Sequence, residues 1–66
     1  MRIELEQETD GRWIAEVSDL PGALAYGLDR QEAINRVLTL ALRIMADRLE
    51  HGEKIPELST LFQVAA

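Results

Sequence analysis

The sequence predicts a two-layer α+β domain with the element order β-β-β-α-β, in which an antiparallel sheet packs on one long helix. Three observations carry this prediction. Apolar residues alternate on both sides of a turn dipeptide, Asp10-Gly11, which indicates a hairpin. Apolar residues then recur every three or four positions over residues 29–50, which indicates a helix. The whole chain of 66 residues is the size of one small domain, residues 1–66.

The hairpin is expected to join strands at residues 2–8 and 12–17. Asp10-Gly11 is typical of a two-residue turn in which both central residues have positive φ. The alternation places apolar residues on one face of each strand: Ile3 and Leu5 on the first, and Trp13, Ala15 and Val17 on the second.

The segment that follows the hairpin predicts a corner and a third strand. Pro21-Gly22 favours a type II turn with Gly22 at positive φ, so residues 18–22 are interpreted as a loop. Residues 23–26 are a weakly patterned third strand, because alanine has little preference for β structure, and Gly27 ends it.

A helix is expected from Asp29 to Glu50, a length of about 33 Å. Asp29 suits the N-cap with Glu32 as its capping-box partner, and Gly52 suits the left-handed position after the helix. Leu40 and Leu42 widen the apolar face, which fits either self-association through the helix or a deeply concave sheet. The residues assigned to the core of the domain are Trp13, Leu20, Ile34, Leu38 and Met45.

The C-terminal segment predicts a fourth strand. Pro56 ends a linker after the helix, and residues 59–64 have the composition of a strand that returns to the sheet.

The net charge of −5 lies mainly on the hairpin. Residues 1–28 contain six acidic residues and two arginines and therefore carry −4, whereas residues 29–54 contain five acids and five bases. Such a segment repels phosphate backbones and attracts a basic partner. The alternative is that Glu4, Glu6 and Glu8 are only the solvated side of an amphipathic strand.

The order and spacing of several short motifs resemble the HicB-like antitoxins of toxin-antitoxin pairs. The resemblance covers nearly all of the chain, and one departure is Ala23, where the family often has Cys. The matching residues are Asp10-Gly11, Trp13, Ala15-Glu16-Val17, Asp19-Leu20-Pro21-Gly22, Gly27, Glu32-Ala33, Gly52-Glu53 and Ile55-Pro56.

The resemblance implies a fold similar to the double-stranded-RNA-binding domain and in part to RNase H. It also implies a function, which is to bind and neutralise a small basic HicA-type mRNA-cleaving toxin. Many family members add a C-terminal DNA-binding domain; the chain stops at Ala66, so neither that domain nor operator binding is expected. The residues expected to face the toxin are Glu4, Glu6, Asp10, Glu16 and Asp19.

An alternative within the same class of interaction proteins is a solitary HicB-like domain without a toxin. It would serve as a homo-oligomeric scaffold or bind a small ligand. A homo-oligomer, either a dimer or a tetramer, is expected in both cases, because a chain of this size without cysteine has few other means of reinforcing its core.

Other functions are not expected from these residues. His51, the only histidine, suits a helix end rather than catalysis, so we expect no enzyme, and the spacing of ligand-type residues predicts neither a metal nor another cofactor. Direct binding of nucleic acid is not expected of an acidic sheet. The absence of a long apolar run predicts a soluble, cytoplasmic protein that does not enter a membrane.

Overall fold

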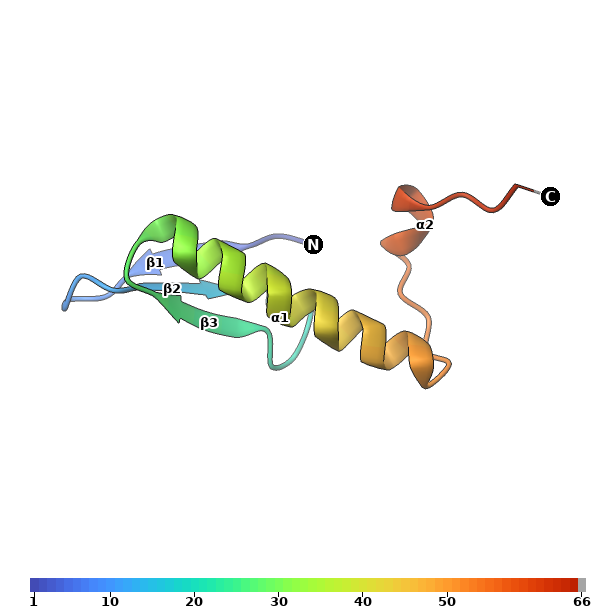
Figure 1. Ribbon diagram of the computed structural model, residues 1–66, viewed down its shortest axis with the longest axis horizontal. Coiled ribbons are helices and arrows are strands. Elements are labelled where there is room, and N and C mark those ends of the chain that lie inside the picture. Colours follow the sequence, from blue (N-terminus) through green and yellow to red (C-terminus); the bar gives the residue numbers. More distant parts are fainter. Residues whose placement is uncertain (66) are drawn as a thin grey trace.

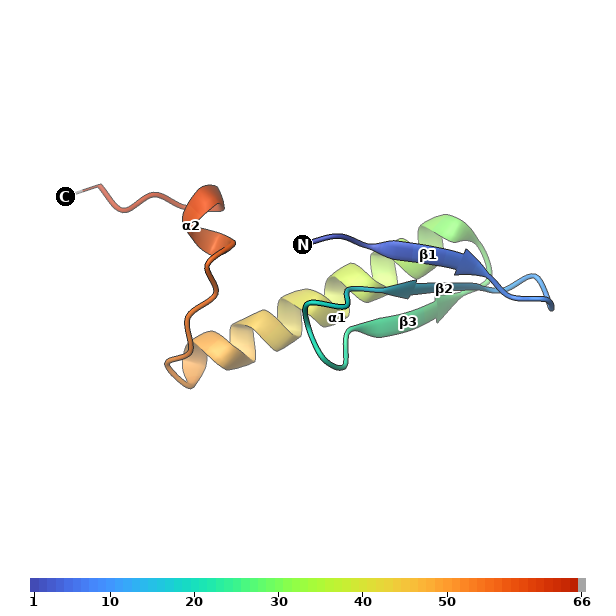
Figure 2. The same cartoon turned by 180° about the vertical axis from the view of Figure 1, so that it is seen from behind.

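A computed structural model describes residues 1–65 and has a three-stranded antiparallel sheet with one long helix across one of its faces (Figure 1). The strand order is β1-β2-β3. The view from behind shows the sheet in front of the helix and its other face uncovered (Figure 2). The α+β class and the β-β-β-α order are therefore confirmed. The elements are β1 (Glu4–Gln7), β2 (Trp13–Glu16), β3 (Leu24–Gly27), α1 (Arg30–Glu50) and α2 (Leu58–Leu61).

The hairpin between β1 and β2 is confirmed, but its turn differs from the expected one. Gly11 has a φ of 92°, whereas no residue other than glycine has positive φ among the residues described, so Asp10 does not adopt the left-handed conformation. Gly11 N–H donates to Glu8 O at 3.0 Å, and Glu8 N–H donates to Arg12 O at 2.7 Å. This is a three-residue loop in which a type I turn is followed by a glycine bulge. One left-handed residue is enough for this loop.

The Pro21-Gly22 corner is formed as expected. Gly22 has a φ of 93°, and Ala23 N–H donates to Leu20 O at 2.9 Å across the turn. The corner folds Leu20 back against the sheet, where only 1% of it is exposed. β3 begins at Leu24, one residue later than expected.

Both ends of α1 carry the expected caps. The Asp29 carboxylate accepts a hydrogen bond from Glu32 N–H at 2.8 Å, and the Glu32 side chain accepts one from Leu28 N–H at 2.9 Å. At the other end, Gly52 has a φ of 79°, and the N–H groups of Gly52 and Glu53 donate to carbonyls of the last turn at 3.0 and 2.9 Å. This pattern is a Schellman motif, which ends the helix and turns the chain back.

The expected fourth strand at residues 59–64 is wrong, because the chain forms the short helix α2 there. Local hydrogen bonds explain the difference. The hydroxyls of Ser59 and Thr60 donate to the carbonyls of Pro56 and Glu57 at 2.7 and 2.8 Å, which holds residues 56–61 in a helical turn. Phe62 then has extended dihedral angles, φ −128° and ψ 126°, but pairs with no strand in the described chain.

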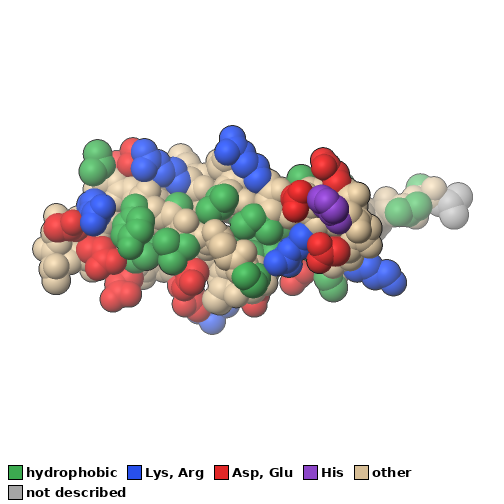
Figure 3. Space-filling view, turned by 90° about the horizontal axis from the view of Figure 1, so that it is seen from below, with side chains coloured by type: hydrophobic (Ala, Val, Ile, Leu, Met, Phe, Trp, Pro, Cys, Tyr) green, Lys and Arg blue, Asp and Glu red, His purple; other side chains and the backbone are tan. Residues whose placement is uncertain are grey.

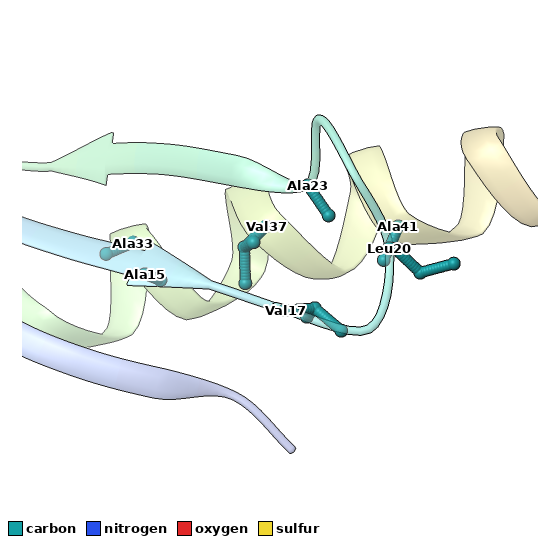
Figure 4. Packing of buried hydrophobic residues seen from close by; sticks show 7 residues of the cluster. All are labelled: Ala15, Val17, Leu20, Ala23, Ala33, Val37 and Ala41. Carbon is teal, nitrogen blue, oxygen red and sulfur yellow. The ribbon is translucent and has the colours of Figure 1, made fainter. Parts of the chain in front are cut away.

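The core between α1 and the sheet consists mainly of small side chains (Figure 4). Leu20 and Val37 are the largest of the fully buried ones. Of the residues assigned to the core from the sequence, Leu20 is confirmed, Trp13, Ile34 and Met45 are half-buried, and Leu38 is wrong because 43% of it is exposed. The buried cluster is Ala15, Val17, Leu20, Ala23, Ala33, Val37 and Ala41.

The molecule is elongated, with extents of 51 × 21 × 15 Å. Its radius of gyration is 13.9 Å, whereas a compact domain of this length has about 11 Å. The cause is α1, which is about 32 Å long, while a strand of four residues spans about 13 Å. The fully buried residues of α1 end at Ala41, so its last turns extend beyond the sheet, as its length predicts.

Candidate functional site

The candidate site is the face of the sheet that α1 leaves uncovered, which we call the outer sheet face. Side chains alternate along each strand, and Leu5, Ala15 and Ala25 point to the core. The intervening residues therefore point away from the helix. The outer sheet face consists of Glu4, Glu6, Ile14, Glu16, Leu24 and Tyr26.

Three carboxylates lie together on this face. Glu4 is directly opposite Glu16 in the register of β1 and β2, and Glu6 is the next residue of β1 on the same face. All three side chains are exposed, and none of them forms an ion pair within residues 1–65. Like charges directly opposite each other destabilise a sheet. The arrangement therefore favours a cation brought by another molecule.

Apolar side chains continue the same rows toward β3. Ile14 lies opposite Tyr26, and Leu24 lies opposite Glu16. Leu24 and Tyr26 are each 41% exposed. Figure 3 views the molecule from below, the side on which β3 lies, and shows hydrophobic side chains next to acidic ones. An exposed apolar patch bordered by charge is typical of a protein interaction site.

Arginines border this patch at two points. The Arg12 guanidinium lies 5.1 Å from the centre of the Tyr26 ring, which is a cation–π arrangement. Arg36 of α1 donates to the Tyr26 carbonyl at 3.2 Å. Both contacts hold the aromatic residue and its strand in place.

Asp10, another residue expected at the interface, is occupied in the hairpin loop. Its carboxylate accepts a hydrogen bond from Arg12 N–H at 3.0 Å and another from Arg12 Nε at 2.8 Å. The backbone hydrogen bond, followed by the side-chain one, lowers the pKa of Asp10. The partner arginine already compensates this charge, so Asp10 stabilises the loop.

Asp19 lies in the loop after β2, at the opposite end of that strand from Asp10. The structure thus brings together Glu4, Glu6 and Glu16 on one face and places the other two expected residues beyond its ends. Sequence reasoning missed Ile14, Leu24 and Tyr26. Their signal was present, because Leu24 and Tyr26 alternate with the small buried residues of the third strand.

The only histidine lies at the exposed end of α1. His51 Nδ1 lies 2.7 Å from Asp47 O and 3.6 Å from its carboxylate, an exposed pair in the last turn of the helix. Within residues 1–65, no three acidic or histidine side chains gather in a way that could hold a metal ion.

No helix among the described residues has the length and apolar character required to span a bilayer. No protein-family model matches the chain, and the comparisons with curated proteins and with solved structures found no match either.

Proposed function

We propose that this protein is an antitoxin-like interaction module, similar to the HicB-like antitoxins, that binds and neutralises a small basic HicA-type mRNA-cleaving toxin. The observation that carries the proposal is the group of three exposed, unpaired carboxylates beside an apolar patch. An mRNA-cleaving toxin acts in the cytoplasm, so this is also the compartment that we propose for its partner.

The charge of the outer sheet face supports a basic protein as the ligand rather than a nucleic acid. Glu4, Glu6 and Glu16 repel phosphates, but they complement the cationic surface with which a nuclease holds RNA. Complementary charge accelerates encounter and fixes orientation, while apolar contacts at Leu24 and Tyr26 add affinity. In this proposal the protein acts by covering the RNA site and catalyses no reaction.

The test measures how tightly two triple variants of this protein bind a HicA-type toxin. The toxin comes from the same cells and is purified in a catalytically inactivated form. The first is Glu4→Lys/Glu6→Lys/Glu16→Lys, on the outer sheet face. The control is Asp47→Lys/Glu50→Lys/Glu53→Lys, which makes the same change in net charge at the exposed end of α1. Binding is measured by titration calorimetry and the association rate by surface plasmon resonance at several salt concentrations.

We expect the first variant to bind at least about tenfold more weakly, with a slower association rate and less dependence on salt. The control should bind as the wild type does. If both variants bind equally well, the outer sheet face is not the interface; if the wild-type protein binds no such toxin, the antitoxin proposal is wrong.

A second function, a solitary homo-oligomeric domain, rests on a different observation. Leu38, Leu42 and Leu49 are 43%, 61% and 50% exposed along one side of α1. Apolar residues in such a row are typical of a self-association surface. In that case the domain would serve as a scaffold or bind a small ligand.

A further inference from the structure

One edge of the sheet has unpaired backbone groups. Glu8 N–H donates to Arg12 O, so the alternation of an antiparallel ladder directs the backbone groups of Glu6 and Glu4 toward β2. The N–H and C=O groups of Ile3, Leu5 and Gln7 point in the opposite direction. Within residues 1–65, none of these groups has a hydrogen-bond partner.

The edge at β3 is different. The Tyr26 carbonyl accepts a hydrogen bond from Arg36 at 3.2 Å, and Leu24 N–H donates to Gly22 O at 3.0 Å. Half of the outward groups of this four-residue strand are therefore already used. The edge at β1 is the one open to another strand.

An apolar surface lies beside the open edge. Arg36 marks the flank of α1 that faces β3, so the opposite flank, on which Ile34, Leu38 and Met45 lie at helical spacing, faces β1. Because α1 packs on β2 and β3, Ile3 and Leu5 on the inner face of β1 are only half-buried. The open edge of β1 and this helix flank lie side by side, and we call them together the gap. At one end of it, Met1 and Met45 line a cavity with Glu57, Leu58 and Leu61 of the chain's own C-terminal segment.

The C-terminal tail has the properties of a strand that would fill such a gap. The tail is the segment after α2, residues 62–65, which contains no charged side chain, and Phe62 and Val64 are 71% and 97% exposed. Phe62 already has extended dihedral angles. Both ribbon views show the tail after α2 running away from the sheet of its own chain (Figures 1 and 2). The tail therefore pairs with no strand of its own sheet.

We propose that the tail of a second copy of this chain pairs with the open edge of β1 as a fourth strand, and that two copies exchange tails reciprocally in a dimer. Phe62 and Val64 then face Ile3 and Leu38 in the gap, and Gln63 lies on the outer face beside Glu4. This interaction is a form of strand addition, in which backbone hydrogen bonds give affinity and alternate side chains give specificity.

Charge disfavours direct pairing of two β1 strands. An antiparallel β1–β1 pair centred on Leu5 places Glu4 of one copy opposite Glu6 of the other, on both sides of the twofold axis. The tail adds no charge to that edge.

The exposed area of the single chain is consistent with a dimer. The chain exposes 5166 Å², whereas a compact monomer of its mass exposes about 4,200 Å². The excess of roughly 1,000 Å² is close to the area that each partner buries in a stable interface, about 800 Å².

The test uses two single substitutions in the tail, Phe62→Lys and Gln63→Lys, which add the same charge to adjacent exposed residues. Sedimentation equilibrium gives the dimer dissociation constant, and amide hydrogen exchange followed by NMR reports protection at Ile3, Leu5 and Gln7. The wild type should be a dimer in which these edge amides are protected. Phe62→Lys should raise the dissociation constant at least about 30-fold and remove the protection.

Gln63→Lys is the matched control, because its side chain faces solvent beside Glu4 and should leave the dimer intact. If the wild type is a monomer, the proposal is wrong. This holds even if the edge amides are protected, because the chain's own tail would then pair with β1. A dimer that Phe62→Lys does not weaken also overturns it, since the helix flank alone would then hold the copies together.

Discussion

The carboxylates of Glu4 and Glu16 lie opposite each other on β1 and β2. Their repulsion is expected to lower the free energy of unfolding. In the double-mutant cycle of Glu4→Lys and Glu16→Lys, each single variant converts a like-charge pair into an opposite-charge pair on adjacent strands. A cross-strand pair of this kind changes stability by about 0.2–1 kcal/mol relative to neutral residues. Reversal of its sign should therefore stabilise the fold by about 1 kcal/mol.

The double variant brings two lysines together and should return to nearly the stability of the wild type. Urea unfolding at one fixed protein concentration measures the four free energies, because association makes apparent stability depend on concentration. A gain of 1 kcal/mol also raises the melting temperature by about 4–8 °C in a domain of this size. Glu53→Lys is the control for net charge, since Glu53 is exposed beyond the end of α1.

The same single variants should weaken binding of a basic partner, so stability and affinity move in opposite directions. Equal stability of all four proteins would show that the two carboxylates do not repel each other across the strands. A gain of the same size in Glu53→Lys would show that overall charge, and not the pair, is the cause.

Three further substitutions test the fold. Gly27→Ala should cost about 2 kcal/mol or more in urea unfolding, because the added Cβ would lie 2.9 Å from Asp29 O and overlap the first turn of α1. Asp29→Ala should cost about 1 kcal/mol and reduce the helical circular dichroism signal on heating, since Glu32 N–H loses its acceptor. The lowered pKa of Asp10 implies stability that is present above about pH 4 and lost as the pH falls through the lowered pKa. Wild type should therefore lose more stability than Asp10→Asn between about pH 5 and pH 2.

Local signals in the sequence were sufficient for most of the fold. Pro21-Gly22 required positive φ at one defined residue, and Asp29 with Gly52 marked both ends of the helix. At Asp10-Gly11, the dipeptide was compatible with two loop types, and the sequence did not distinguish them. Turn and cap signals depend only on residues a few positions away in the sequence. They can therefore be recognised without knowing how the elements pack.

Predictions that depended on packing were less successful. The helical period placed Leu38 on the apolar face, but alanines at positions 33 and 41 let that part of α1 approach the sheet most closely and turned Leu38 to the side. Similarly, residues 59–64 alternate like a strand, yet within one chain the hydroxyl hydrogen bonds of Ser59 and Thr60 hold a helical turn. Periodicity alone identifies a face, and the neighbouring element determines which part of it is buried.

Only part of the candidate site could be predicted in the same way. Strand alternation was enough to place Glu4, Glu6 and Glu16 on a common face. Net charge, however, does not distinguish a free carboxylate from one that is already paired, and Asp10 was assigned to the interface although an arginine two residues away occupies it. That Asp10 and Asp19 lie beyond the two ends of β2 could be seen only once the strand bounds and the register were known.

The alanines between the two layers also fix a distance. Ala15, Ala23, Ala33 and Ala41 are at most 4% exposed, so only methyl groups separate much of the helix backbone from the strands. Ala33 is fully buried, so a larger side chain there has no free volume to occupy and would push α1 away from the sheet. If α1 tilts as a rigid body, its C-terminal end, beyond the sheet, is displaced most. A single methylene added in the core would thus alter the width of the gap along β1.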